Sequence, residues 1–524
     1  MKKLFSYRSV LAFVIALLPA CLAVWPIFGS RFIPTHDGEY HIIRFWQFYT
    51  SLASGSWFPR WAPDLNLGYG IPLFTFQYPF PNYIGSLFHQ YGLSYVDSVK
   101  WTLGFGYLVA IIFCYLWVRR IFDRIASVVA TVTCAYVPYW FVDIYIRGSV
   151  GEVWAIAWVF AALYAIFTKR SLFIVITCMF LVISHNIMAL IFIPILLIYA
   201  YIHNRLSVVD ILLGVGAASY FWIPALYEQR FIVGISQVNI FDYFPRLDQL
   251  LIPSWGSGFR GQITGGNEMS YQIGILPIIL FGWAGVMAIR IRKATLPKEI
   301  RFALVVFAAA LFLMTPWSVW IWKLVPFAHF VQYPWRLLSI VVIMIPILAG
   351  YIASRFRFGW MIALIAMILT FGYSRPVTYE PRTDEYYLNQ SSFTQGTNSM
   401  GNAFQTKWFA LESDSRPDFS MSSGTVSAER IHVTAYHVTL SSTQGGILTS
   451  PIAYYPGWLL DIGKTDIPGN TDVQGRLTFG ISKGQHEGIV RLGLTPWQMI
   501  AISVSILSLS VAVVSFILRK YYVG

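Results

Sequence analysis

Residues 35–44, THDGEYHIIR, form a dense group of chemically reactive side chains directly after the first apolar segment. They include two carboxylates, two imidazoles and a guanidinium, although only 12% of the whole chain is charged. If the stretch is helical after Thr35, the i+4 and i+3 spacings place Asp37, His41 and Arg44 on one face. An acid, a proton carrier and a phosphate-binding cation beside an apolar segment suggest a reaction on a lipid-linked substrate.

The composition is that of an integral membrane protein. The chain has 524 residues, of which 56% are hydrophobic and 17% aromatic, and its mean hydropathy is +0.60. Soluble domains are only about half apolar and about a quarter charged. The net charge of +13 lies in short segments between apolar runs, as the positive-inside rule requires, so we do not expect nucleic-acid binding. The four cysteines all fall within apolar runs and predict buried thiols, not disulfides.

Apolar segments long enough to cross a bilayer recur along the chain. We expect twelve of them, at about residues 10–29, 98–118, 124–142, 151–168, 171–184, 186–202, 207–227, 271–290, 302–320, 335–353, 357–372 and 495–518. The fifth and sixth meet at Ser184, His185 and Asn186, and a single re-entrant hairpin over 171–202 is the alternative. The first segment resembles a signal peptide, and we interpret it as an uncleaved helix.

Basic residues between the segments set the expected orientation. With both termini in the cytoplasm of a cell-membrane protein, these patches lie inside: Lys2, Lys3 and Arg8; Arg119, Arg120 and Arg124; Lys169 and Arg170; Arg205; Arg290, Arg292, Lys293, Lys298 and Arg301; Arg355 and Arg357; Arg519 and Lys520. Long outer loops then cover 30–97 and 228–270.

The chain divides into three predicted parts. Residues 1–372 form a transmembrane domain, 373–494 an extracytoplasmic β-domain, and 495–524 a final span with a short cytoplasmic tail. Short alternating runs such as ERIHVTAYHVTL (429–440), separated by turn residues, indicate strands. About 120 residues of this kind suit a small β-sandwich.

Several phrases resemble one family. The first outer loop, together with YIRGSVGEVWA (145–155), SHNIMAL (184–190), FVQYPWRLL (330–338) and YYPGWLLDIGK (454–464), is similar to the large bacterial and archaeal membrane proteins of YfhO type, which include those labelled 6-pyruvoyl-tetrahydropterin-synthase-related. The resemblance implies the GT-C superfamily: a polytopic helical membrane protein of about twelve spans with a C-terminal β-sandwich-like domain. Relatives often carry a Glu-Tyr-Leu-Pro-like phrase where this chain has GTNSMGNAFQTKW (396–408), so acceptor identity does not carry over.

That superfamily transfers a sugar from a polyprenyl-phosphate donor to an acceptor on the outer face, here a cell-envelope glycan, lipid or polymer. In the resembled superfamily, an acidic residue early in the first outer loop serves as base or acceptor-orienting group, and that position is Asp37 here. We expect Asp37 to act as the general base of an inverting transfer. The alternative for Asp37 is a helix N-cap.

The other candidates follow from residue type. Glu39 could orient the acceptor, or it could be a solvated surface residue. His41 could form a hydrogen bond with Asp37. Guanidinium groups grip phosphate bidentately, so the candidates for the donor phosphate are Arg44, Arg60, Arg147 and Arg336, with snorkelling as the alternative. Polar residues at membrane depth are usually functional, which adds His185 and Asn186. Glu152 could pair with Arg147 or cap an outer helix, and His36 is a further candidate as a metal ligand.

No cofactor is required by the sequence. A divalent cation, Mg²⁺ or Mn²⁺, is the alternative reading of His36, Asp37, Glu39 and His41, whose side chains include hard oxygen and imidazole ligands.

Two other functions compete with glycosyl transfer. A lipid or polysaccharide transporter or flippase should carry charges near mid-bilayer and broken helices in paired positions. A scaffold that recruits partners through the β-domain would leave THDGEYHIIR without a purpose. The charges gather at the outer ends of the segments, which favours chemistry at the outer interface.

Overall fold

The computed structural model describes residues 7–29, 31–234, 239–258, 268–290, 296–326, 328–410, 417–463 and 465–522. The predicted inner basic residues Lys2, Lys3, Arg292 and Lys293 lie outside these ranges.

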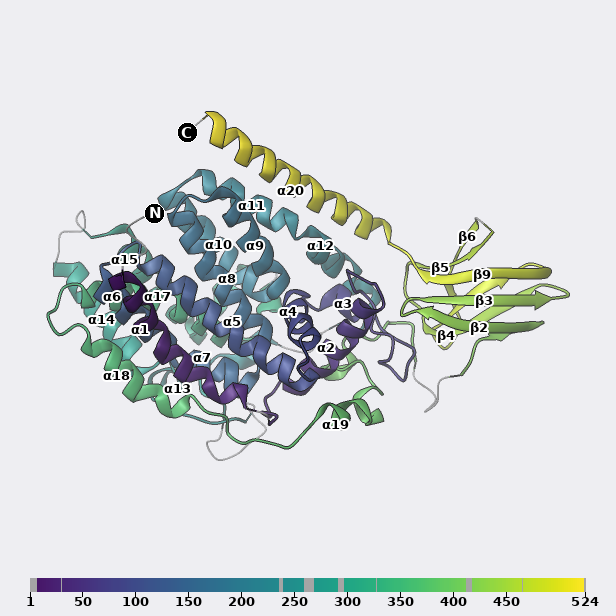
Figure 1. Cartoon of the computed structure of the whole chain (residues 1–524), viewed down its shortest axis with the longest axis horizontal. Helices are drawn as coiled ribbons and strands as arrows, with labels where there is room; N and C mark the ends of the chain where they lie inside the picture. Colours follow the sequence, from purple (N-terminus) through teal and green to yellow (C-terminus); the bar gives the residue numbers. More distant parts are fainter. Residues whose placement is uncertain are drawn as a thin grey trace.

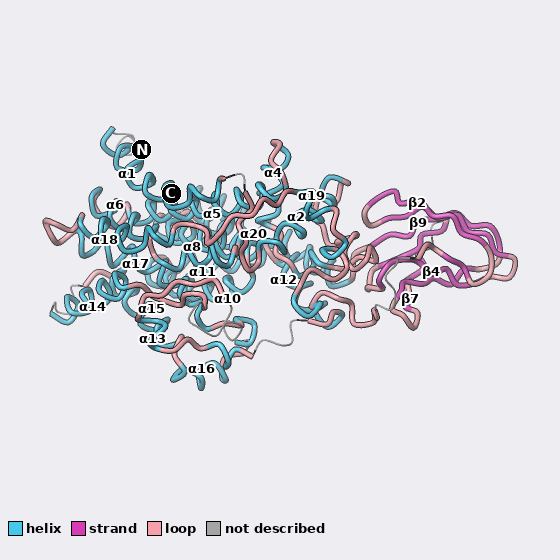
Figure 2. Tube along the Cα trace, turned by 90° about the horizontal axis from the view of Figure 1, so that it is seen from below, coloured by secondary structure: helices cyan, strands magenta, loops and turns pink. Residues whose placement is uncertain are grey.

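The chain is mostly helical, with strands confined to its C-terminal part (Figures 1 and 2). The longer helices are α1 (Tyr7–Val24), α2 (Gly38–Ala53), α4 (Phe80–Gln90), α5 (Tyr95–Val118), α6 (Arg124–Ala135), α8 (Val150–Phe167), α9 (Ser171–Ser184), α10 (Asn186–His203), α11 (Leu206–Ala217), α12 (Ser219–Glu228), α14 (Ile275–Arg290), α15 (Lys298–Leu313), α17 (Leu338–Ala353), α18 (Met361–Thr370) and α20 (Pro496–Tyr522). Shorter helices are α3 (Leu73–Phe76), α7 (Pro138–Phe141), the π-helix η2 (Val142–Arg147), α13 (Leu247–Leu251), α16 (Val319–Leu324) and α19 (Asp384–Leu388).

Apolar helices of membrane-spanning length are present. Among the described residues six helices qualify by length and composition, or nine if each of three bent pairs counts as one span. The bent pairs are 124–135 with 138–147, bent by 43°, 206–217 with 219–231, bent by 61°, and 298–313 with 316–324, bent by 92°. Three shorter apolar helices occur at 171–184, 275–290 and 361–373. Each predicted segment therefore contains an apolar helix, while the number of spans stays a prediction.

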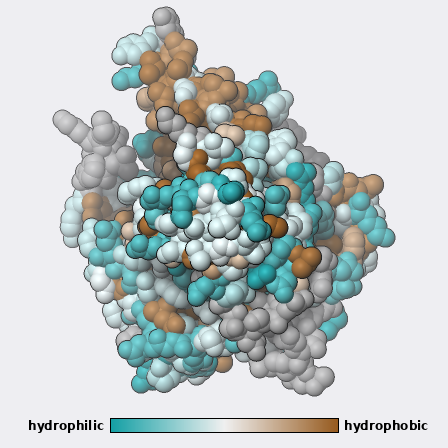
Figure 3. Space-filling model, turned by 90° about the vertical axis from the view of Figure 1, so that its right-hand side faces the viewer, coloured by the Kyte–Doolittle hydropathy of each residue, from teal (hydrophilic) through white to brown (hydrophobic). Residues whose placement is uncertain are grey.

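The helical part is packed around α8 and α17. All of α17 is buried, and so is nearly all of α8, because other helices surround both. Small residues allow this: a Cβ on Gly106 of α5 would lie 2.9 Å from Nε1 of Trp154 on α8. By contrast, α20 exposes apolar side chains along most of its length. It lies at the top of Figure 1, and the corresponding surface in Figure 3 is hydrophobic.

The segment that follows α1 and residues 373–410 fold together. Phe32, Ile42 and Phe48 share one apolar cluster with Tyr387 and Phe404. Backbone bridges join 32 to 380 and 232 to 406. Within the predicted β-domain 373–494, the described residues before 417 thus pack on α2 and form short helices instead of strands.

The strands run from 420 to 492 and form two antiparallel sheets. One has the order β1 (Ser420–Met421), β4 (Gly446–Ala453), β8 (Arg476–Ile481), β7 (Asn470–Thr471); the other has the order β2 (Thr425–His432), β3 (Ala435–Ser442), β9 (Gly484–Leu492), β5 (Trp458–Ile462), β6 (Thr465–Pro468). Val438 and Val490 from one sheet and Leu448 and Phe479 from the other share a core. The strand end of the molecule has a largely hydrophilic surface (Figure 3).

Both chain ends lie toward the side of the molecule away from the strands (Figure 1). This places the start of α1 and the end of α20 at the same end of the helix bundle.

Candidate functional site

The loop that carries Asp37 is fixed against the π-helix η2. The backbone N–H of His36 donates to Ile146 O, and that of Asp37 donates to Arg147 O, each at 2.9 Å. Thr35 fits between two glycines: a Cβ on Gly148 would lie 2.2 Å from Thr35 Oγ1, and one on Gly38 would lie 2.5 Å from it. Gly148 also has φ +66°, which other residues rarely adopt. The close packing therefore needs glycine at both positions.

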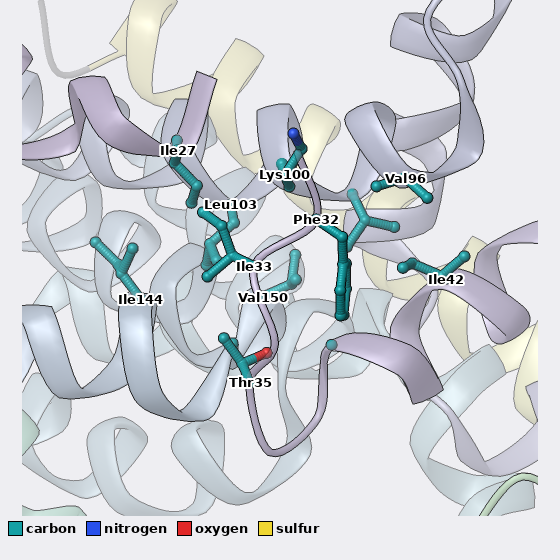
Figure 4. Close-up of a pocket in the computed structure, with 13 residues that line it drawn as sticks. Ile27, Phe32, Ile33, Thr35, Ile42, Val96, Lys100, Leu103, Ile144 and Val150 are labelled. Atoms are coloured by element: carbon teal, nitrogen blue, oxygen red, sulfur yellow. The ribbon is translucent and has the colours of Figure 1, made fainter. Parts of the chain in front are cut away.

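An apolar cavity lies beside this loop (Figure 4). Ile33, Ile144 and Val150 line it together with Thr35 and Lys100. The Lys100 ammonium is already bound to the carbonyls of Gly29 and Arg31 and to Asp97. Apart from the Thr35 hydroxyl, the described residues that line this cavity bring no free polar side chain to it, so the reactive side of the loop is the one that carries Asp37.

Asp37 occupies the N-cap position of α2, but its side chain makes no capping hydrogen bond. The carboxylate is half-buried and forms no hydrogen bond or ion pair with the described residues. Its charge acts on His41, Arg44 and Arg147. A carboxylate that is close to cations but bonded to none of them can accept a proton or a ligand.

A buried charge cluster lies next to this loop. We use that name for Tyr139, Asp143, Arg147, Glu152 and Arg336. Arg147 Nη1 contacts Asp143 Oδ1, donates to Glu152 Oε2 at 2.8 Å and to the Tyr139 hydroxyl at 3.2 Å. The Tyr139 hydroxyl donates to Glu152 Oε1 at 2.5 Å. Both carboxylates are fully buried, so Arg147 is needed to neutralise them.

Local helix geometry assembles the cluster. Pro138 begins α7 after the break that follows α6, and η2 continues it with the wide π-helical turn that is frequent at functional sites. Asp143 and Arg147, four residues apart, are thereby brought into contact, and Gly148 ends the turn. Glu152 then comes from the first turn of α8.

Arg336 reaches the same cluster from the start of α17. Its Nη1 donates to Val331 O and Gln332 Oε1, both at 2.9 Å. Its Nε is 3.9 Å from Glu152 Oε2 and is buried without a hydrogen-bond partner. Tyr333 and Trp335 stack on each other, and the guanidinium groups of Arg336 and Arg147 lie 5.1 Å and 4.9 Å from their respective ring centres.

The two guanidinium groups keep free donors. In the described part of the chain, the Nη2 atoms of both Arg147 and Arg336 make no hydrogen bond, since all bonds to the terminal nitrogens run through Nη1. Both groups lie within 4 Å of the same Glu152 oxygen. Two neighbouring cations with unused N–H groups form an anion-binding arrangement.

The rings of His185 and Tyr78 lie beside the buried charge cluster. Their rings stack with centres 4.9 Å apart, and Tyr78 covers Gly151, where a Cβ would lie 2.4 Å from its ring. His185 caps α10 by accepting from Met188 N–H, and the charges of Glu152, Arg147 and Arg336 act on it. Burial and the Asp37 charge raise the pKa of Tyr78 to about 12, so its hydroxyl stays protonated.

Two histidines flank Asp37 and are held neutral. Burial lowers the pKa of His41 to about 4, against an opposing effect of the Asp37 charge. Burial also lowers the pKa of His36, whose Nε2 lies 2.6 Å from Ser257 O. At neutral pH both imidazoles are uncharged, and each can donate one hydrogen bond and accept another.

Three predicted site residues have other partners. Arg44 donates to Gln77 Oε1 at 3.2 Å and to Asn398 O at 2.7 Å, which ties α2 to the 391–409 segment. Glu39 pairs with Arg382. Asn186 is exposed and bonds only to its own neighbour Ile187. None of these three shares a bond with the buried charge cluster.

Arg60 belongs to a separate junction. Its Nη1 contacts Gln498 and donates to Gly493 O at 3.0 Å. Gln498, Thr495 and Tyr455 all donate to the buried carboxylate of Glu228, at 3.0, 2.5 and 2.5 Å. Arg60 thus connects the segment between α2 and α3 to the end of the strands and to α20. Its contact with a phosphate stays a prediction.

The structure does not group the four candidate metal ligands. Among the described residues, no three His, Cys, Asp or Glu side chains come together as a metal ion would require. Glu39 and His36 are engaged with Arg382 and Ser257. The positions of these four residues do not support a metal site, which stays an alternative.

Sequence reasoning missed Asp143, Tyr139, Tyr78, Gln332 and Trp335. The signal for Asp143 was available: an acid four residues before Arg147, both at the end of an apolar run, is costly in a membrane unless paired. Trp335 lies directly before Arg336 in a phrase already singled out. Tyr78 carried no distinguishing pattern, since aromatic residues fill the whole stretch around it.

Comparisons with known proteins give a weak likeness to solved structures. No protein-family model matches the chain, and no curated protein matches it; the resemblance to YfhO-type proteins therefore has no family match. Among solved structures, the apo oligosaccharyltransferase of Archaeoglobus fulgidus is similar with a TM-score of 0.40 and 15% identity, over 72% of this chain and 57% of that one. This chain thus spans little more than half of that protein's length. A likeness this low assigns no activity here.

Proposed function

We propose that the protein is a membrane glycosyltransferase of GT-C type. It transfers a sugar from a polyprenyl-phosphate donor to a cell-envelope acceptor at the outer face of the membrane. One observation carries the proposal: the unpaired Asp37 carboxylate is held by backbone bonds beside Arg147, and the guanidinium groups of Arg147 and Arg336 both lie within 4 Å of one Glu152 oxygen. This is a base beside a phosphate-binding pair.

The proposed step needs both parts. The acceptor O–H bond breaks as its proton passes to Asp37, and the acceptor oxygen bonds to the anomeric carbon of the sugar. The bond from that carbon to the phosphate oxygen breaks, and the electron pair stays with the polyprenyl phosphate. The charge developing there is stabilised by guanidinium groups that are already oriented, which is the most effective form of such stabilisation. Attack from the opposite face inverts the anomeric configuration.

The neighbours of these residues serve the same step. Neutral His41 and His36 beside Asp37 leave its charge uncompensated. Tyr78, Tyr333 and Trp335 provide aromatic walls that restrict water around the phosphate.

A transporter or flippase is the second candidate, and one observation favours it. The 124–135 and 138–147 pair, which carries Asp143 and Arg147, is a bent helix pair, as are two others. Broken helices line the binding sites of many transporters. Such a protein would bind the lipid phosphate at the same arginines without using Asp37 as a base.

Transfer and transport can be separated with purified protein. The protein, in detergent and then in liposomes, is given a panel of radiolabelled polyprenyl-phosphate sugars with envelope extract as acceptor. Labelled product in detergent supports transfer. Movement of the carrier across liposomes, without product from any donor, would replace the transferase proposal by the transporter. Running both assays with and without a chelator tests the divalent-cation alternative.

A further inference from the structure

A basic cluster lies at the end of the helix bundle away from the strands. It consists of Arg119, Arg120 and Arg124 after α5 and Lys169 and Arg170 after α8. Arg120, Lys169 and Arg170 are exposed, and the other two are half-buried. Two short connections thus present five cations side by side.

Contacts with neighbouring helices locate the cluster. Ser171, which follows Arg170, bonds to Asp210 and to Arg519 near the C-terminal end of α20. Phe122, between Arg120 and Arg124, packs on Gly350 of α17, where a Cβ would lie 2.6 Å from its ring. The cluster therefore meets the leaflet on the side of the chain ends.

No described acid forms an ion pair with these five cations, although the exposed Asp123 lies between Arg120 and Arg124 in the chain. Asp210 is paired with Arg519 at 3.0 Å and Glu299 with His203 at 3.1 Å. Asp123 caps α6 by accepting from Ala126 N–H. Within the described residues, none of the five cations forms an ion pair, so the positive charge is left for a ligand.

Arg120 and Arg170 are oriented around one ring. Their guanidinium carbons lie 5.7 and 5.5 Å from the centre of Tyr164, and Arg120 Nη2 donates to the Tyr164 hydroxyl at 3.4 Å. Tyr164 is itself buried at the end of α8. Stacking on a fixed ring orders both side chains and leaves most of their N–H groups free. The neighbouring Ile125 is 69% exposed and offers an apolar surface for an acyl chain.

We propose that Arg120 and Arg170, held by Tyr164, bind the phosphate of an anionic phospholipid headgroup in this leaflet. The site is separate from Asp37 and does not depend on the proposed sugar transfer. Basic pockets between spans are a recognised mode of anionic headgroup binding.

Retention of lipid by the purified protein tests this proposal. Full-length protein is incubated with mixed micelles that contain either phosphatidylglycerol or phosphatidylcholine, and bound lipid is counted by native mass spectrometry. Wild type should retain phosphatidylglycerol preferentially. Arg120→Gln with Arg170→Gln should weaken that retention by roughly fivefold for each lost arginine.

A matched pair controls for general charge. Arg355 and Arg357 are also exposed, follow α17 near Phe122, and lie against Tyr351 and Phe358. Arg355→Gln with Arg357→Gln should leave retention unchanged. Equal losses in both double variants, or equal retention of the two lipids by wild type, would overturn the proposal.

Two further measurements complete the test: competition by inorganic phosphate and a comparison of single variants. Millimolar inorganic phosphate should not displace the lipid; displacement would assign the cluster to a soluble phosphate compound instead. If the double variant cannot be purified, single Arg170→Gln is compared with single Arg357→Gln, and equal retention by the two would again contradict the proposal.

Discussion

The two arginines of the buried charge cluster differ in how far the fold depends on them. Arg147 neutralises Asp143 and Glu152, both fully buried, whereas Arg336 lies 3.9 Å from Glu152. Arg147→Gln should therefore cost about 3–5 kcal/mol of stability, the usual penalty for an unpaired buried charge. Arg336→Gln should lower the melting temperature only slightly but weaken binding of polyprenyl phosphate. Thermal unfolding and lipid-phosphate binding in detergent measure both effects, and a reversed order would contradict the assigned roles.

His41 should make stability fall in mild acid. Its pKa is about 4 in the folded chain against 6.5 for a free imidazole. Between pH 6.5 and pH 4, His41 is protonated in the unfolded chain but stays neutral in the folded chain. The free energy of unfolding therefore decreases as the pH falls from 6.5 toward 4, by at most about 3 kcal/mol. Melting temperatures at pH 7.5 and pH 5 should differ less for His41→Asn than for wild type. The same difference in both proteins would exclude His41 as the cause.

At the scale of elements, the contact between the Asp37 loop and η2 is the least tolerant feature. Gly148→Ala places a Cβ 2.2 Å from Thr35 Oγ1, and should displace Asp37 and abolish sugar transfer. Gly55→Ala is the matched control, because Gly55 also has positive φ, at +101°, but has no atom within 4 Å of the added Cβ. It should cost about 1 kcal/mol of backbone strain and keep activity. Equal activity of the two variants would show that the loop contact is dispensable.

Patterns along the chain predicted the helices and strands well, but they did not predict which residues contact each other. Apolar runs and strand alternation marked the helices and sheets because those signals are local. The bond from Asp37 N–H to Arg147 O joins residues far apart in sequence, and no local pattern reports it. Arg60 shows the same limit: its residue type predicts a phosphate contact, and no local pattern reports that Gln498 and Gly493, remote in sequence, contact its Nη1. The phosphate contact stays a prediction. Asp143 was missed because residues 124–142 were interpreted as one uninterrupted span that ends just before it, whereas the helix breaks after 135 and its second part, 138–147, contains Asp143.

For the whole molecule, the Glu228 junction fixes the strands to the helix bundle. Its carboxylate accepts from Tyr455, Thr495 and Gln498 in a fully buried position. Glu228→Ala leaves these donors unpaired at about 1–3 kcal/mol each. We expect a lower melting temperature and faster proteolysis between the strands and α20, with Asp466→Ala, whose partner Arg491 is exposed, as the control. Unchanged proteolysis of Glu228→Ala would mean that other contacts hold the strands in place.

The measurement that tests the central claim most directly is single-turnover sugar transfer by Asp37→Asn, with donor affinity measured on the same sample. Glu39→Gln is the control, because Glu39 is a neighbouring carboxylate already paired with Arg382. If Asp37 is the base, Asp37→Asn should lose about 100-fold or more in transfer rate while donor affinity persists, and Glu39→Gln should stay near wild type. Equal turnover by Asp37→Asn and wild type would remove Asp37 from the mechanism.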